Sequence, residues 1–147
     1  MNEMKIVMFL SCALFTLTAA CTEPAPIEPL GLWDDTYTWS AGTCQLTGTA
    51  KFPFTVVDAG SGSYVLVNND PVVTSVTGTV RCTQDRCDLT LHETFTVVDS
   101  GTTTTGTHDA SLVLDEANVI RGSGTIAFRF QNGATCSQTF SSTGLLR

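Results

Sequence analysis

Residues 87–101 read CDLTLHETFTVVDSG, and this stretch decides the fold. Apolar residues stand at every second position and alternate with polar ones, which is the period of a β-strand with one buried face. The apolar phase consists of Leu89, Leu91, Phe95 and Val97. Ser100-Gly101 then has the composition of a two-residue hairpin turn. The stretch predicts a strand that covers a core with one face and then reverses direction.

A second copy of the pattern lies about 41 residues earlier in the chain. There CQLT at 44–47 leads to FTVVDAG at 54–60, as CDLT at 87–90 leads to FTVVDSG at 95–101. An ancestral duplication explains the likeness. Two copies are too few for a solenoid, which needs about three repeats to bury its faces.

Turn signals divide the rest of the chain at similar intervals. They are Ala41-Gly42, Gly60 to Gly62, Asn68 to Pro71, Gln84-Asp85, Ser100-Gly101, Asp115 to Asn118 and Asn132-Gly133. Seven turns between alternating segments indicate eight strands that pair as antiparallel neighbours. No long stretch has apolar residues at helical spacing.

Alternation assigns an inner face to these strands, and glycine interrupts it repeatedly. The inner phases are Trp33, Tyr37 and Trp39; Leu46, Phe52, Phe54 and Val56; and Ile120, Ile126, Phe128 and Phe130. The interrupting glycines are Gly48, Gly78, Gly106, Gly122, Gly124 and Gly144. Such glycines let strands coil towards closure. We therefore expect an all-β fold, a small eight-stranded antiparallel up-and-down (meander) barrel, with a β-sandwich as the alternative.

Two features at the ends of this domain resemble the calycin superfamily of lipocalin and avidin-like barrels. Gly31-Leu32-Trp33 is similar to the G-x-W that opens the first strand there, and Arg147 occupies the place of a late arginine that packs on the tryptophan. The resemblance implies a closed barrel that encloses a ligand site. The helix that precedes the last strand in lipocalins has no counterpart.

The N-terminus resembles a bacterial lipoprotein precursor. An apolar run from Ile6 to Leu17 is too short to span a bilayer, and LTAAC at 17–21 is similar to a lipobox. The resemblance implies a signal peptide at 1–20, diacylation of Cys21 and membrane anchoring through the acyl chains. Thr22 in place of Asp favours an outer membrane. An ordinary secretory signal cut after Ala20 is the alternative.

The proline-rich run TEPAPIEPL at 22–30 follows the predicted lipid site. Prolines favour an extended, semi-rigid chain. The expected organisation is therefore a signal peptide at 1–20, a lipidated cysteine with its tether at 21–30, and a barrel domain at 31–147. It places the domain in the cell envelope, on either the periplasmic or the surface side.

The net charge of the chain indicates which kinds of partner it can bind. Seven Lys and Arg stand against 14 Asp and Glu, a net charge of −7. A surface of that sign repels phosphate backbones, so nucleic acid is not an expected partner. The expected partners are the membrane, through Cys21, and a small apolar ligand or an envelope protein.

Four cysteines remain outside the predicted signal and lipid site: Cys44, Cys82, Cys87 and Cys136. An even number in an exported chain favours two disulfides, over a zinc site without any C-x-x-C pair. Facing Val80 with Leu89 also sets Cys82 opposite Cys87. Up-and-down order brings Cys44 and Cys136 to one barrel end, which makes Cys44–Cys136 the second bridge. An inward Cys136 requires a loop longer than Asn132-Gly133, or a bulge.

The same strand-register argument predicts which residues face the two histidines. A two-residue turn at Ser100-Gly101 sets Leu91 against Ala110, and then Glu93 faces His108 on the inner side while His92 faces Asp109 outside. A one-residue slip would pair His92 with His108 as half of a zinc site, but it would turn the apolar face outward. No metal site is expected.

Glu93 with His108 is the strongest candidate for function. A polar pair on the inner face of a barrel can orient a ligand, although a satisfied salt bridge near the barrel mouth is the more common explanation. The predicted ligand-binding set is Glu93, His108, Asp35, Trp33, Tyr37 and Trp39. Such aromatics can line a pocket or simply fill a small barrel.

Catalytic signatures are missing from the sequence, so no enzyme and no cofactor are expected. The first functional hypothesis is a lipid-anchored binding module for a small apolar or amphipathic ligand. The alternative is a structural or interaction protein of the envelope, or an inhibitor, with a filled core. Thr102 to Thr105 would then form a contact edge.

Overall fold

The computed structural model describes residues 26–116 and 118–147, and eight β-strands account for most of them. The predicted signal peptide and Cys21 lie outside the described residues. The strands are β1 (Gly31–Gly42), β2 (Thr49–Gly60), β3 (Ser63–Val67), β4 (Val73–Cys82), β5 (Cys87–Asp99), β6 (Thr102–Glu116), β7 (Val119–Phe130) and β8 (Thr135–Leu146). Within the described residues, no helix is long and apolar enough to cross a membrane.

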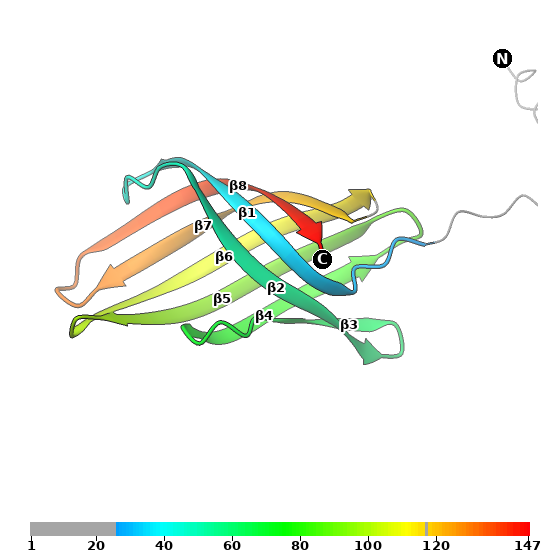
Figure 1. Ribbon diagram of the computed structural model, residues 1–147, viewed down its shortest axis with the longest axis horizontal. Helices are drawn as coiled ribbons and strands as arrows, with labels where there is room; N and C mark the ends of the chain where they lie inside the picture. Colours follow the sequence, from blue (N-terminus) through cyan, green and yellow to red (C-terminus); the bar gives the residue numbers. More distant parts are fainter. Residues whose placement is uncertain (1–25, 117) are drawn as a thin grey trace, which may run out of the picture.

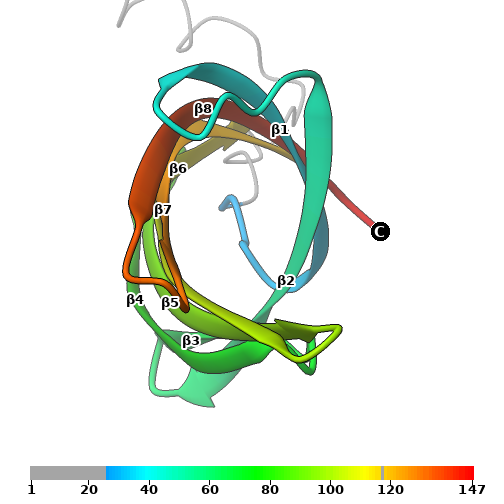
Figure 2. The ribbon, with the colours of Figure 1, turned by 90° about the vertical axis from the view of Figure 1, so that its left-hand side faces the viewer.

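All eight strands belong to one antiparallel sheet in the order β3-β2-β1-β8-β7-β6-β5-β4. Neighbours in sequence are neighbours in space, and β1 closes the meander on β8 (Figure 1). Viewed along its length, the sheet curls into a ring (Figure 2). The expected up-and-down barrel is confirmed, and the sandwich is excluded because all the strands of the described residues belong to this one sheet.

The barrel is nearly closed, with a seam between β3 and β4. These two strands end the sheet order and are not paired with each other by hydrogen bonds. Side chains close the seam instead, since a Cβ built on Gly78 of β4 would lie 2.6 Å from Leu66 Cδ1 of β3. Thr102 to Thr105, expected as a contact edge, pair with β5, and Thr104 and Thr105 also pair with β7. The open edges belong to β3 and β4.

The predicted registers around β5 are confirmed. Val80 faces Leu89 and Cys82 faces Cys87 in the β4–β5 pair, and Glu93 faces His108 in the β5–β6 pair. Both predicted disulfides form, Cys44–Cys136 and Cys82–Cys87, with Cα–Cα distances of 5.0 and 4.0 Å. The two-residue alternation along the strands therefore predicts which residues face each other, both in the Glu93–His108 pair and in the Cys82–Cys87 bridge.

The first turn differs from its prediction. Ala41-Gly42 continues β1, and the chain reverses through residues 43–48. Leu46 and Gly48, expected on the inner face of a strand, lie in this loop, where Leu46 is half-buried and Gly48 has φ of +79°. The loop also carries Cys44, whose bridge to Cys136 pins it against β8.

The last turn is the longer loop that an inward Cys136 required. β7 ends at Phe130 and β8 begins at Thr135, so four residues connect them. Cys136 then pairs with Phe128, in the same phase as the buried Gln138 and Phe140. The bridge Cys44–Cys136 lies on the inner side as a result.

One end of the barrel is filled and covered by the segment Pro26–Leu30, and we call it the plug end. Pro29 is fully buried, and its carbonyl accepts a 2.8 Å hydrogen bond from Nε1 of Trp33. Ile27 packs against the core, and its amide donates to Gln84 in the β4–β5 turn. Figure 2 shows this segment, in blue, inside the ring. The described part of the predicted tether is thus packed on the barrel.

The opposite end, which we call the mouth end, carries the loops 43–48, 68–72, 100–101 and 131–134. Burial of the inner phase falls off towards it. Along β5, Cys87 is 0% exposed and Leu91 4%, whereas Val97 is 38% exposed. The core therefore occupies the plug half and the middle of the barrel and thins out at the mouth.

Two inner-face glycines explain how large rings fit this narrow barrel. A Cβ on Gly106 would lie 2.2 Å from Cζ of Phe95, the residue it faces, and a Cβ on Gly124 would lie 2.4 Å from Cζ of Phe140. Each glycine leaves room for the aromatic ring of the neighbouring strand. Because glycine has no side chain, the barrel wall leaves space at these two positions for the aromatic rings.

Candidate functional site

The mouth end holds a cavity of about 230 Å³ inside the barrel. Its walls are mostly apolar and come from β2, β4, β5, β6, β7 and the loop 68–72. The lining residues are Lys51, Phe52, Pro53, Asn68, Asp70, Val72, Val73, Glu93, Phe95, Val97, His108, Ile126 and Phe128. Glu93 and His108 are 3% and 1% exposed, so the two predicted residues form a buried polar floor under apolar walls.

A chain of hydrogen bonds runs through this floor. Nδ2 of Asn68 donates to Oε1 of Glu93 at 2.8 Å, and Nδ1 of His108 lies 2.8 Å from Oε2 of the same carboxylate. Nε2 of His108 lies 2.6 Å from the hydroxyl of Tyr37. Four side chains from β1, β5, β6 and the loop 68–72 are thereby held in fixed positions.

The protonation of Tyr37 bears on the direction of these bonds. Burial raises the pKa of the Tyr37 hydroxyl, and the nearby charges of Asp35 and Glu93 raise it further. The phenol therefore keeps its proton, which it can donate to Nε2 of His108 when that nitrogen is unprotonated. In that tautomer the imidazole proton lies on Nδ1 and is donated to Glu93, so both ring nitrogens are satisfied.

Asp35 lies beside this chain and is 0% exposed. Burial raises its pKa from 3.8 to about 6, while a hydrogen bond from Ser142 and the proximity of His108 oppose the rise. The hydroxyl of Ser142 is within 2.6 and 2.7 Å of the two carboxylate oxygens. Asp35 does not line the cavity but adds a second buried carboxyl beneath its floor.

The predicted aromatic residues divide between two roles. The Tyr37 ring is stacked between Phe52 and Phe140, with centroids 4.4 and 3.9 Å away, and Trp39 meets it edge-on at 6.3 Å. Trp33 lies at the plug end, where it is bonded to Pro29. None of Trp33, Tyr37 and Trp39 lines the cavity, and Tyr37 supports its floor through the bond to His108.

The other histidine is on the outer wall. Nδ1 of His92 lies 2.6 Å from Oδ1 of Asp109, and both side chains are exposed. The observed register separates His92 from His108, contrary to the slipped alternative. Across residues 26–116 and 118–147, no group of three or more His, Cys, Asp or Glu side chains is placed to hold a metal ion.

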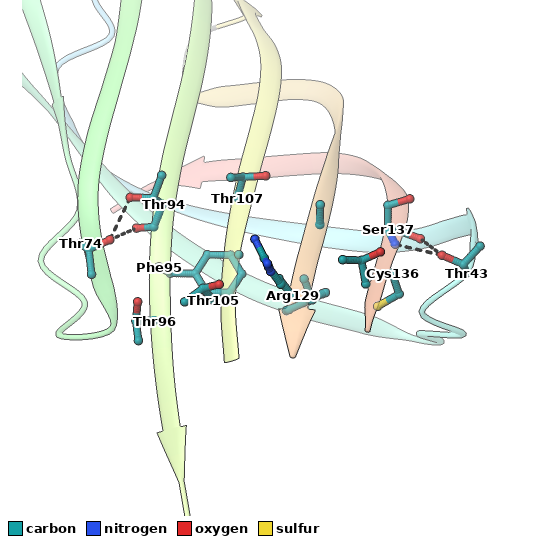
Figure 3. Close-up of a pocket in the computed structure, with 14 residues that line it drawn as sticks. Thr43, Thr74, Thr94, Phe95, Thr96, Thr105, Thr107, Arg129, Cys136 and Ser137 are labelled. Atoms are coloured by element: carbon teal, nitrogen blue, oxygen red, sulfur yellow. Dashed lines mark hydrogen bonds between the residues drawn. The ribbon is translucent and has the colours of Figure 1, made fainter. Parts of the chain in front are cut away.

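A second hollow lies on the outer surface, over β5 to β8. It is an open depression of about 640 Å³ lined largely by hydroxyl groups, among them Thr94, Thr96, Thr105 and Thr107 (Figure 3). Several of these hydroxyls bond to neighbours, as Thr74 does to Thr94 at 2.8 Å. The depression is larger than the inner cavity, but it has no buried polar side chain and no enclosed apolar wall.

Sequence reasoning missed three polar residues around the cavity and its support. Asn68 was expected only as part of a turn, and its contact depends on the path of the loop 68–72. Ser142 and Gln138 share the inner phase of Phe140, so continued alternation along β8 would have found both. Gln138 donates to the carbonyl of Ser40, and among the described residues its buried Oε1 has no partner.

Comparisons with family models, with curated proteins and with solved structures give no match for this chain.

Proposed function

We propose that this protein is an exported, lipid-anchored envelope lipoprotein whose barrel binds a small apolar or amphipathic molecule in the mouth cavity. The observation that carries the proposal is the mainly apolar cavity, open at the mouth, with the Glu93–His108 pair on its floor. Ligand sites commonly combine apolar walls with a few convergent polar groups. The volume of about 230 Å³ lies below the roughly 300–1,000 Å³ typical of drug-sized ligands, so the ligand is small.

Support for binding over a filled scaffold comes from the arrangement of the core. Packing in the plug half and the middle already includes Trp33, Leu112, Leu114 and Ile120, all at most 2% exposed. These residues already provide a packed core, so the stability of the fold does not explain why the mouth end is hollow and partly exposed. Buried polar groups such as Glu93 and His108 weaken a core unless they are fully bonded, and their position at a cavity fits a role in binding.

The plug segment supports an orientation for the anchored protein. Pro26 lies at the plug end, and Cys21 precedes it by five residues, which span at most about 18 Å. A 13-residue strand such as β5 is about 43 Å long, or roughly 33 Å along a barrel axis tilted by about 40°. An acyl chain on Cys21 would hold the plug end near the membrane and direct the mouth away from it.

Filling the cavity tests the binding proposal. Val73 lines the cavity, so Val73→Phe should block it, whereas Val65 is exposed on β3 outside the cavity and Val65→Phe is the matched control. We expect 2-phenylethanol to bind the full chain in calorimetric titrations, with binding lost in Val73→Phe and kept in Val65→Phe. Equal binding by both variants would contradict the proposal, as would a native protein that binds none of 2-phenylethanol, 2-phenylethylamine and 3-phenylpropionate.

Fractionation tests the anchor separately. The native protein should pellet with membranes and carry acyl chains detectable by mass spectrometry, and Cys21→Ser should move it to the soluble fraction. Membrane association unchanged by Cys21→Ser would contradict lipidation without bearing on ligand binding.

A further inference from the structure

The hydrogen-bond donors on the cavity floor are used almost entirely within the protein. The Tyr37 hydroxyl is hydrogen-bonded to Nε2 of His108, Nδ1 of His108 donates to Glu93, and Asn68 gives one amide proton to the same carboxylate. The second amide proton of Asn68 has no acceptor among the described residues. On the floor, a ligand that offers only acceptors therefore meets one free donor at most, and the ammonium of Lys51 lies at the rim.

Acceptor capacity, by contrast, remains. An ionised carboxylate offers about four lone-pair sites, and the bonds from Asn68 and His108 occupy two of those on Glu93. Glu93 is 3% exposed and lines the cavity, so its remaining sites are shielded from bulk water. Leaving buried acceptors unmet is unfavourable, and a ligand with N–H donors would meet them.

The charge of the groups at the floor also favours a ligand that donates hydrogen bonds and carries a positive charge. In the part of the chain that the structure describes, the only ion-pair partner of Glu93 is His108, so the carboxylate is uncompensated whenever that imidazole is neutral. At the rim, Lys51 and Asp70 contribute one charge of each sign. The ionised form of Asp35 beneath the floor and the net charge of −7 add to a negative potential. Such a potential concentrates cations.

The walls suit the body of such a ligand. Phe52, Phe95 and Phe128 line the cavity together with aliphatic side chains, and the rings of Phe95 and Phe128 meet edge-to-face with centroids 5.6 Å apart. Aromatic faces attract ammonium groups as well as apolar surface. A short apolar or aromatic body therefore fits beside the rings while its head reaches Glu93.

We infer that the mouth cavity takes a small organic cation, a primary amine on a short apolar or aromatic body, whose ammonium group donates to the Glu93 carboxylate. This inference rests on the proposed binding function and specifies the class of ligand. It makes Glu93 the residue that selects the head group, with Asn68 and His108 holding the carboxylate in position.

Three ligands with one phenyl body and different heads test the inference: 2-phenylethylamine, 2-phenylethanol and 3-phenylpropionate. In calorimetric titrations of the full chain at pH 7.5, the amine should bind at least tenfold tighter than the alcohol, and the carboxylate weakest. An alcohol or carboxylate that binds as tightly as the amine overturns the inference but leaves the binding function standing. Failure of all three to bind overturns both.

Charge removal at one position isolates the role of Glu93. Glu93→Gln keeps the shape of the side chain, and Asp109→Asn removes the same charge from the outer wall as a control. We expect Glu93→Gln to weaken amine binding at least tenfold and alcohol binding less than threefold, with Asp109→Asn changing neither by more than threefold. Equal weakening of amine and alcohol by Glu93→Gln overturns the inference. If Glu93→Gln fails to fold, the titrations of the native protein with the three ligands still test the inference.

Discussion

Ser142 of β8 donates its hydroxyl proton to Asp35 of β1, and its Oγ atom lies 2.6 and 2.7 Å from the two carboxylate oxygens. Both residues are buried, at 5% and 0% exposed. A single hydroxyl does not replace the water that the carboxylate loses on burial. The pKa of Asp35 accordingly rises from 3.8 to about 6.

The first prediction is a pH-dependent stability that Asp35 controls. Because its folded-state pKa lies above the unfolded value, Asp35 stabilises the fold most below pH 4, and this stability is lost as pH rises through 6. A shift of about two pH units corresponds to about 3 kcal/mol. Relative to the native protein, Asp35→Asn should gain about that much free energy of unfolding between pH 4 and pH 8, measured by urea unfolding.

Asp34 offers the control for this prediction. It is the neighbouring carboxylate, and it pairs with Arg147 rather than with buried groups. Asp34→Asn should show no comparable gain between pH 4 and pH 8. If native and Asp35→Asn proteins had parallel stability curves, Asp35 would not titrate in this range.

The second prediction compares the two disulfides. Cys44–Cys136 closes a loop with a sequence separation of 92, and Cys82–Cys87 one of only 5. In the loop-entropy treatment the long closure stabilises by about 5 kcal/mol and the short one by about 2 kcal/mol. Paired Cys→Ala changes should therefore lower the free energy of unfolding more at 44 and 136 than at 82 and 87.

The burial of Cys87 reduces the difference in unfolding free energy expected between the two double variants. Cys87 is 0% exposed, so replacing it also removes buried sulfur and adds to the loss at the short bridge. A ranking reversed by more than about 1 kcal/mol in urea unfolding of the two double variants would contradict the dominance of the long loop.

Strand alternation explains why so much of this fold was predictable. A period of two leaves two registers for each hairpin, and only one of them buries Leu89 and Leu91. That register set Glu93 against His108 and Cys82 against Cys87, and the structure has both pairs. Local pattern and long-range pairing agree wherever the strands are regular.

Loops and termini follow no such period, and the errors lie there. Asn68 reaches Glu93 through the path of the loop 68–72, and the turn after β1 forms at 43–48 rather than at Ala41-Gly42. Pro29 belongs to a proline-rich run that is typical of a tether, yet it is fully buried in the barrel and its carbonyl accepts from Nε1 of Trp33. Composition describes the free chain and not what it packs against.

The third prediction concerns a glycine that a methyl group cannot replace. A Cβ on Gly124 would lie 2.1 Å from the backbone oxygen of Asp109 and 2.4 Å from Cζ of Phe140. Backbone of a paired strand cannot move away as a side chain can. Gly124→Ala should therefore lower the free energy of unfolding by about 1–3 kcal/mol or more in urea titrations.

Ser123, the exposed neighbour on the same strand, provides the comparison. Ser123→Ala points away from the core and should change stability by less than about 0.5 kcal/mol. A Gly124→Ala variant as stable as Ser123→Ala would show that β6 and β7 can separate enough to admit the methyl group.

The fourth prediction tests the hydrogen bond from Tyr37 to His108. Tyr37→Phe keeps the ring between Phe52 and Phe140 but leaves Nε2 of His108 buried without its hydrogen-bond partner, which should cost about 1–3 kcal/mol of unfolding free energy. Tyr64→Phe is the matched control, because no hydrogen bond of the Tyr64 hydroxyl exists among the described residues, and its effect should stay below about 0.5 kcal/mol.

The protonation of His108 gives a second readout of the same bond. If Tyr37 donates to Nε2, the imidazole of the native protein carries its proton on Nδ1 at pH 7, and nitrogen NMR of the side chain should show one protonated and one unprotonated ring nitrogen. Two protonated nitrogens would mean a charged histidine. The charge on Glu93 would then be balanced inside the protein, and the floor of the cavity would no longer favour a cation.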